Sequence, residues 1–197
     1  LGRRALAVSG DVVDPEACTE AVRQAMAQFG RVDVLVNNAG IANTVPALRE
    51  QPDEFRKVMD VNVNGTMWMA QACARVMEPG STIVNIASVL GMTSVLMPQA
   101  AYTASKAAVI ALTKDLAQQW TPRKGIRVNA IAPGYFASEM TDQLGDEVMG
   151  KYVVPRTLFG RLGNEGELNP ALLYLASDAS SYVTGVTLPV DGGMLVS

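Results

Sequence analysis

The stretch Ala101-Tyr102-Thr103-Ala104-Ser105-Lys106 lies in a run, residues 99–121, that has no Gly or Pro and predicts a helix. Tyr102 and Lys106 are four residues apart, so their side chains lie one above the other on the helix surface. A nearby cation favours the phenolate and lowers a tyrosine pKa from its usual value of about 10. The pair therefore suggests proton transfer, although such a pair alone is more often a solvated helix face.

Three apolar runs around this helix end in small or polar residues, and each is typical of a buried parallel strand. Residues 34–36 run into Asn37-Asn38-Ala39-Gly40, residues 83–87 into Ser88, and residues 128–131 into Pro133-Gly134. Ligands of open α/β sheets bind at the carboxyl ends of the strands. The three strand ends, Ser88 and the Tyr/Lys pair therefore predict one site.

Strands and helices alternate along the chain, which predicts an α/β fold with a doubly wound parallel sheet. A break is expected near Gly65 within the helix at 52–76. Thr121-Pro122 and Gly125 are expected to end the helix at 99–119. The expected strands are 5–8, 32–36, 83–87, 127–131 and 187–190, and the expected helices are 14–29, 52–76, 99–119 and 168–176.

Residues 134–166 form a long, mixed segment between core elements, which indicates a substrate-binding lid within a single domain, 1–197. Met and Leu dominate this lid and residues 92–97, so they suggest a largely apolar substrate. The alternative is a Met-rich hinge that only packs the lid. The side chains that carry both interpretations are Met92, Leu96, Met97, Met140, Leu144 and Met149.

Composition limits the class of protein. The 197 residues are 49% hydrophobic and 18% charged, enough for a sizeable core, and the net charge of −3 argues against a nucleic-acid surface. No apolar run could span a membrane and no secretory leader is visible, so we expect a cytoplasmic protein. Cys18 and Cys73 are expected to be core thiols. The absence of His excludes a histidine metal site and a Ser/His/Asp triad, and no metal is expected.

The chain resembles the short-chain dehydrogenase/reductase family over essentially its whole length. The motifs stand in the order and spacing of the family. The family pattern Asn-x-x-Gly selects Asn62 over Asn64. Ser88 is selected over Ser94 because only Ser88 directly follows a predicted strand. The matching pieces are Asn37-Asn38-Ala39-Gly40, Asn62 in Val61-Asn62-Val63-Asn64-Gly65, Ser88, Tyr102 with Lys106, Pro133-Gly134 and Asp191-Gly192-Gly193.

This resemblance implies catalytic roles for four side chains. Tyr102 would donate or accept the proton at the carbinol oxygen, and Lys106 would lower the Tyr102 pKa and bind the nicotinamide ribose. Ser88 would hold the substrate oxygen, and Asn62 would support a proton relay through ordered water. Without the resemblance, the favoured interpretations are a strand-end cap for Ser88 and a helix-kink residue for Asn62.

The resemblance also implies NAD or NADP as the cofactor. Asp11 would contact the adenine, unless it is a plain turn residue, and Ser138 stands where the family often has Thr. The full set of implied cofactor contacts is Asp11 and Val12 at the adenine, Asn38, Ala39 and Gly40 at the adenosine ribose, Tyr102 and Lys106, and Pro133, Gly134, Phe136 and Ser138 around the nicotinamide.

One motif of the family, the glycine-rich loop Thr-Gly-x-x-x-Gly-x-Gly, does not occur in the 197 residues. Residues 1–4 read as the tail of a helix, so we expect the N-terminal strand-helix-strand portion to be absent from this chain and dinucleotide binding to be weak. The choice between NAD and NADP stays open.

The expected function is oxidoreduction between a secondary alcohol and a ketone, with acyl thioester, sugar and steroid substrates all compatible. The alternative is a non-catalytic scaffold that has lost cofactor binding. Apolar arcs on the helices at 52–77 and 99–119, including Met67, Trp68 and Trp120, together with the resemblance, predict a homotetramer.

Overall fold

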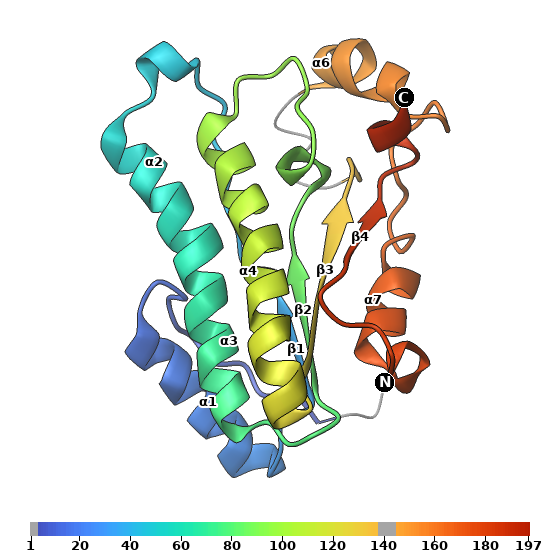
Figure 1. Ribbon diagram of the computed structural model, residues 1–197. Helices are drawn as coiled ribbons and strands as arrows, with labels where there is room; N and C mark the ends of the chain where they lie inside the picture. Colours follow the sequence, from blue (N-terminus) through green and yellow to red (C-terminus); the bar gives the residue numbers. More distant parts are fainter. Residues whose placement is uncertain (1–3, 138–144) are drawn as a thin grey trace.

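A parallel sheet forms the centre of the computed structural model, which describes residues 4–137 and 145–197 (Figure 1). Its four strands lie in the order β1-β2-β3-β4, and all neighbouring pairs are parallel. β2 and β3 are buried almost throughout, as the near-continuous apolar runs of the sequence predict. The strands are β1 (Val34–Asn37), β2 (Thr82–Ile86), β3 (Arg127–Pro133) and β4 (Thr187–Val190).

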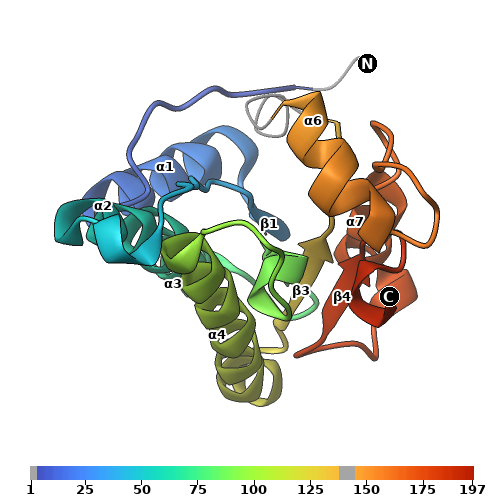
Figure 2. The same cartoon turned by 90° about the horizontal axis from the view of Figure 1, so that it is seen from above.

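Helices cover both faces of the sheet, and neighbouring side chains of β2 point to opposite faces. Ile83 packs in a core with α1 (Pro15–Phe29), α3 (Gly65–Val76) and α4 (Ala100–Lys124). Val84 packs instead against Leu175 of α7 (Asn169–Ala176). Figure 2 shows α1, α3 and α4 on one side and α7 on the other. The predicted doubly wound α/β fold is confirmed.

The ends of α1 follow local sequence rules. The Asp14 side chain accepts a hydrogen bond from the Glu16 backbone N–H at 2.8 Å, and Pro15 occupies the first helical position. Gly30 closes the helix with φ of 78°, in the left-handed region that glycine adopts without a steric penalty. These bounds were therefore predictable almost to the residue.

The second helical segment is continuous, and the break expected near Gly65 is a π-helical turn instead. α2 (Pro52–Met59) passes through Asp60–Asn64, in which the backbone is π-helical, directly into α3. A π-turn inserts extra backbone into a helix without ending it and is frequent at functional sites. It places Asn62 on the buried side, with 1% of its surface exposed.

α4 extends further than expected, past Thr121-Pro122 to Lys124. Proline removes one N–H donor, but the helix ends within the same turn, so only one hydrogen bond is lost there. Gly125, with φ of 65°, then donates its N–H to the Thr121 carbonyl and forms the real stop.

The expected strand at 5–8 is wrong, because residues 4–10 have no regular structure. A strand needs a hydrogen-bonded neighbour, and nothing in the described residues pairs with this segment. The expected helix tail at 1–4 lies mainly outside the described residues. β1 is consequently an edge strand, with Val34 42% and Val36 38% exposed.

Short elements fill the connections between the main helices and strands. Three lie before β4 in the segment expected to be a lid, and one follows β2 and Ser88. They are η1 (Ala47–Arg49), η3 (Val89–Gly91), α6 (Asp146–Val148), η4 (Met149–Val153), η5 (Val154–Arg156), η6 (Asp178–Ser180) and η7 (Met194–Val196). Cys18 and Cys73 are both free and buried, as expected. In residues 4–137 and 145–197, we find no helix with the length and apolar character to cross a membrane.

Candidate active site

Tyr102 and Lys106 project from the first two turns of α4 toward the end of β2. The Lys106 Nζ atom donates a hydrogen bond to the carbonyl of Ile86, the last residue of β2, at 2.8 Å. The same atom lies 5.7 Å from the centre of the Tyr102 ring. Only 5% of Lys106 is exposed, so this ammonium is held deep inside the site.

Burial governs the titration of both side chains. It lowers the pKa of Lys106 to about 8 and raises the pKa of Tyr102 above its ordinary value of 10. A hydrogen bond with the Ser88 side chain opposes the rise at Tyr102 without cancelling it. The expected lowering of the Tyr102 pKa by Lys106 is therefore wrong for this structure, because the loss of hydration is the largest effect on the phenol.

Ser88 stands directly after β2, and its hydroxyl caps the turn that follows. The Ser88 Oγ atom accepts a hydrogen bond from the Leu90 N–H at 3.1 Å. Gly91 lets this turn lie directly on α4, because a Cβ at position 91 would meet the Lys106 carbonyl carbon at 2.7 Å. The missing side chain of Gly91 thus sets how closely Ser88 approaches Tyr102.

Asn62 is fully hydrogen-bonded. Its Nδ2 atom donates to the Ile41 carbonyl and to Ser105 Oγ, both at 2.9 Å, and its Oδ1 atom accepts from the Ile41 N–H at 2.8 Å. A Cβ at Gly40 would lie 3.3 Å from Asn62 Oδ1 and 3.4 Å from Lys106 Nζ. Asn62 therefore joins the end of β1 to α4, whereas Asn64 donates to Asp60 on the exposed side of the turn.

The structure brings most of the sequence-predicted site residues to one end of the sheet. Pro133 ends β3, and Gly134 lies so close to the next strand that a Cβ there would meet the Asp191 Cα at 2.8 Å. Phe136 forms a single bridge with Gly163, and Asn38 and Ala39 are exposed beyond β1.

Three residues predicted to contact the cofactor are Asp11, Val12 and Ser138. The first two have local contacts of their own, and the third lies outside the described residues. Asp11 accepts a hydrogen bond from the Val13 N–H in an exposed turn, and its contact with the adenine stays a prediction. Val12 packs on α3, where a Cβ at Gly65 would lie 2.6 Å from its side chain. Ser138, like Met140 and Leu144, lies outside the described residues.

Sequence reasoning missed a buried polar network that ties the strands to α4. The Asn37 side chain donates to Asn85 Oδ1 at 2.9 Å, and Asn85 donates to Thr113 Oγ1 at 2.9 Å. Ser105, between Tyr102 and Lys106, is also completely buried and accepts the hydrogen bond from Asn62. The available signal was an amide residue inside each otherwise apolar strand, since buried polar groups must be paired.

Comparison with known proteins assigns the chain to a family. The family model described as Enoyl-(Acyl carrier protein) reductase matches residues 1–195. Galactitol 2-dehydrogenase (L-tagatose-forming) from Cereibacter sphaeroides is 45% identical over 194 residues, which are 96% of this chain and 75% of that protein. A short-chain dehydrogenase/reductase from Serratia marcescens superposes with a TM-score of 0.93 at 33% identity, over 99% of this chain and 78% of that one. The chain belongs to the short-chain dehydrogenase/reductase family.

Members of this family are NAD(P)-dependent oxidoreductases, and this chain is one of them. A gluconate 5-dehydrogenase from Burkholderia cenocepacia, in complex with NADP and tartrate, has a TM-score of 0.89 and 38% identity over 95% of this chain and 74% of its own. Gluconate 5-dehydrogenase from Gluconobacter oxydans is 41% identical over all of this chain and 77% of its own length.

The short-chain dehydrogenase/reductase site fits one half of a nicotinamide dinucleotide. Lys106 Nζ has donors to spare beyond its bond to Ile86, and Gly40 leaves open the space beside it that a Cβ would fill. Toward the other half, the 197 residues contain no glycine-rich loop to hold a pyrophosphate. The described residues around Lys106 and Gly40 therefore fit the nicotinamide riboside.

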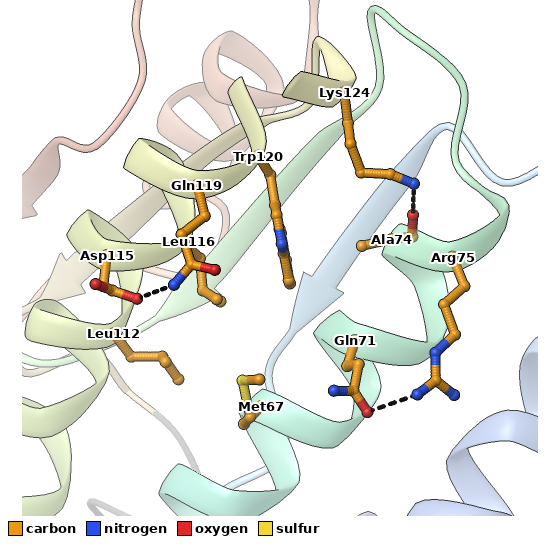
Figure 3. A pocket seen from close by; sticks show the side chains of 10 residues that line it. All are labelled: Met67, Gln71, Ala74, Arg75, Leu112, Asp115, Leu116, Gln119, Trp120 and Lys124. Atoms are coloured by element: carbon orange, nitrogen blue, oxygen red, sulfur yellow. Dashed lines mark hydrogen bonds between the residues drawn. The ribbon is translucent and has the colours of Figure 1, made fainter. Parts of the chain in front are cut away.

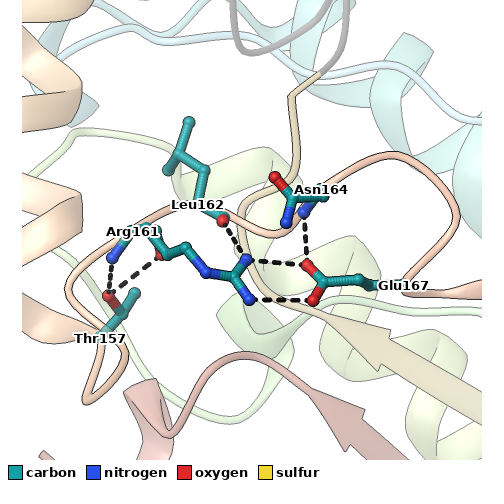
Figure 4. Close-up of polar contacts among 5 residues, drawn as sticks. All are labelled: Thr157, Arg161, Leu162, Asn164 and Glu167. Carbon is teal, nitrogen blue, oxygen red and sulfur yellow. Dashed lines mark hydrogen bonds and ion pairs between the residues drawn. The ribbon is translucent and has the colours of Figure 1, made fainter.

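Hydrogen bonds and an ion pair connect residues 157–167, at the end of the predicted lid (Figure 4). Arg161 makes two hydrogen bonds to the Glu167 carboxylate, at 2.8 and 2.9 Å. Thr157 Oγ1 accepts from the Arg161 N–H, and the Asn164 N–H donates to Glu167. A hollow of about 260 Å³ lies beside this network, against Tyr135 and the end of β4.

Proposed function

We propose that this chain interconverts a secondary alcohol and a ketone, with Tyr102 as proton donor and acceptor. One observation supports this most strongly: Tyr102 interacts with Ser88 while Lys106 is held on the same side of α4, all at the carboxyl end of β2. Ligands of α/β sheets bind at this end. No histidine exists in the chain to perform the same proton transfer.

Each residue has a separate task in this mechanism. The Ser88 hydroxyl donates a hydrogen bond to the substrate oxygen and orients it toward Tyr102. The Tyr102 phenol gives its proton to that oxygen during reduction and takes it back during oxidation. Lys106 binds the ribose hydroxyls of the cofactor, and Asn62 keeps Ile41 and Ser105 in place and supports a proton relay. The bound nicotinamide supplies or accepts the hydride.

We assign the remaining cofactor contacts to residues at the carboxyl ends of the strands, as the family resemblance implies. Gly40, with Asn38 and Ala39 before it, lines the adenosine ribose, and Pro133 and Gly134 flank the nicotinamide together with Phe136. Ser138 keeps its expected role near the carboxamide. Residues 134–166 serve as the substrate-binding lid.

The substrate that we propose is a small polyhydroxylated alcohol or its ketone. Relatives with similar sequences are named for galactitol, gluconate and L-rhamnose as well as for 3-oxoacyl groups. The expectation of an apolar substrate depended on Met residues, but Met149 is 6% exposed in a core cluster against which Met97 packs. These two side chains fill the interior and give no information about the substrate.

Replacing Tyr102 with Phe tests the function. Tyr102→Phe should remove nearly all turnover, because the ring still packs but no phenol proton is available. Assays with a hexitol and about 10 mM NAD or NADP suit the weak cofactor binding that we expect. Tyr174→Phe, on the exposed side of α7, is the matched control and should retain full activity.

Two results would contradict this function. Tyr102→Phe activity within tenfold of the wild type would reject Tyr102 as the acid and base. Absence of any turnover in the wild type, with hydroxyl and carbonyl substrates and both cofactors, would favour the alternative of a non-catalytic scaffold.

We also propose a cytoplasmic homotetramer in which α3 and α4 pair with the same helices of a second copy. A hollow of about 300 Å³ lies between them, with a mainly apolar lining. Figure 3 shows Met67, Leu112 and Trp120 pointing into it. A rim of Gln71, Arg75, Asp115 and Gln119 surrounds the hollow, as polar rims surround protein interfaces. The free thiols of Cys18 and Cys73 suit a reducing compartment.

A further inference from the structure

Three side-chain oxygens near the Tyr102 helix are buried without a hydrogen-bond partner. They are Oδ1 of Asn43, Oε2 of Glu50 and Oε1 of Gln99, and they make up three of the five such atoms among the described residues. A buried acceptor without a donor is destabilising, and native proteins rarely keep one without a reason. Three together therefore point to a role in binding.

The three oxygens belong to one packed unit. Asn43 Nδ2 donates to Glu50 Oε1 at 2.7 Å and closes the loop 41–51 on itself. The Val45 N–H donates to the Pro98 carbonyl at 2.9 Å, and Val45 forms a bridge with Gln99. Gln99 Nε2 also approaches Thr44 Oγ1, at 3.4 Å. The loop after β1 and the segment before α4 thus hold the oxygens in one unit.

This unit borders the proposed active site at both ends. The loop begins at Ile41, whose N–H and carbonyl both bond to Asn62. Gln99 stands at the start of α4, three residues before Tyr102, so the two residues occupy neighbouring positions on one helical face. A substrate carbon held at Tyr102 would place its next few substituents within reach of Gln99 and the loop.

The chemistry of the unit limits the ligand. The free atoms are all acceptors, and Glu50 is a carboxylate, so they need hydroxyl or other donors and repel a carboxylate or phosphate. The Glu50 carboxylate also fixes the Asn43 amide, since only its NH₂ side can face an anion. A neutral chain of several hydroxyl groups meets these requirements, whereas an acyl thioester offers few donors.

We infer that the loop 41–51 and Gln99 recognise a neutral polyhydroxylated substrate, a polyol or sugar, through the free oxygens of Asn43, Glu50 and Gln99. This inference rests on the proposed function and deepens it, because it assigns the recognition of the proposed substrate to named residues at the same site. Leu48 at the tip of the loop is fully exposed, so the loop lies at the surface.

The experiment compares three substrates with one loop variant. Wild-type kcat/KM is measured for a hexitol, for 2-hexanol and for gluconate, and then for Asn43→Leu. We expect the hexitol to be preferred, and we expect Asn43→Leu to lower hexitol kcat/KM about tenfold or more while 2-hexanol is unchanged. Gln51→Leu is the control and should leave all three values unchanged, because this exposed amide at the end of the loop bonds only to the Arg49 carbonyl.

Gln99→Met is the second variant, for the case that Asn43→Leu does not fold by circular dichroism. The inference is overturned if gluconate or a 3-oxoacyl thioester is preferred to the hexitol, or if the folded variants lower hexitol and 2-hexanol turnover equally. Ligand-observed NMR with the hexitol measures binding without turnover, so it tests the inference separately from the proposed function. If the wild type binds the hexitol and the folded variant does not, the inference is supported even when no turnover is seen. If the wild type binds no hexitol, the inference is refuted.

Discussion

Raising the pH should stabilise this protein through Lys106 more than through any exposed lysine. Burial holds the Lys106 pKa at about 8 in the folded chain, against 10.5 for a hydrated lysine. The unfolded chain therefore binds more protons between these two values, so the free energy of unfolding rises with pH in that window. Below about pH 8 the folded state carries the full penalty of a buried ammonium, about 3 kcal/mol.

The assay compares wild type with Lys106→Met, which has a side chain of similar length but no charge. Between about pH 7 and pH 9.5 the wild type should gain about 2 kcal/mol relative to the variant, or about 4–8 °C in Tm for a domain of this size. Urea unfolding at several pH values measures the gain. Lys114→Met, an exposed position on the same helix, is the control and should show no such trend.

If the difference in free energy of unfolding between wild type and Lys106→Met does not change with pH, this reasoning is refuted. That result would mean that the hydrogen bond from Lys106 to the Ile86 carbonyl compensates the ammonium for its lost hydration. Lys106 would then stay protonated throughout the measured range and would carry a permanent positive charge into the site.

Two further predictions concern assembly and cofactor affinity. Trp120→Glu should convert the proposed tetramer to a smaller species, measured by light scattering, because a carboxylate would be buried in the hollow between α3 and α4. A monomeric wild type at micromolar concentration would contradict the proposed interface. The 197-residue chain should bind NADH and NADPH with a Kd weaker than about 1 mM, or less than about 4 kcal/mol of binding free energy, because these 197 residues contain no glycine-rich loop to hold the pyrophosphate. Calorimetry tests this, and micromolar binding would disprove it.

Local rules predicted the elements that local interactions decide. Asp14, Pro15 and Gly30 define both ends of α1, and the strand β4 was predicted at the residues where it occurs. The strand expected at 5–8 failed for the opposite reason. Its apolar sequence is suitable, but a strand is stable only when a neighbour pairs with its backbone, and none of the described residues pairs with it.

The residues of the candidate site were predictable because several independent signals agreed. Ser88 followed a strand, Tyr102 and Lys106 had helical spacing, and the family motif selected Asn62. Their energetics were not predictable, since a pKa depends on burial in three dimensions. The sequence indicates that Lys106 is near Tyr102, but only the fold shows that Lys106 is buried and Tyr102 is partly buried.

The titration of these two side chains has a consequence for the direction of catalysis. A Tyr102 pKa above 10 keeps the phenol protonated at neutral pH, which suits proton donation to a ketone. Oxidation needs the phenolate, and a positive Lys106 favours it only while the lysine is protonated, below about pH 8. At higher pH the solution favours the phenolate, but Lys106 loses the charge that stabilises it. The two effects oppose each other, so oxidation should rise less steeply with pH than the titration of an isolated tyrosine would require.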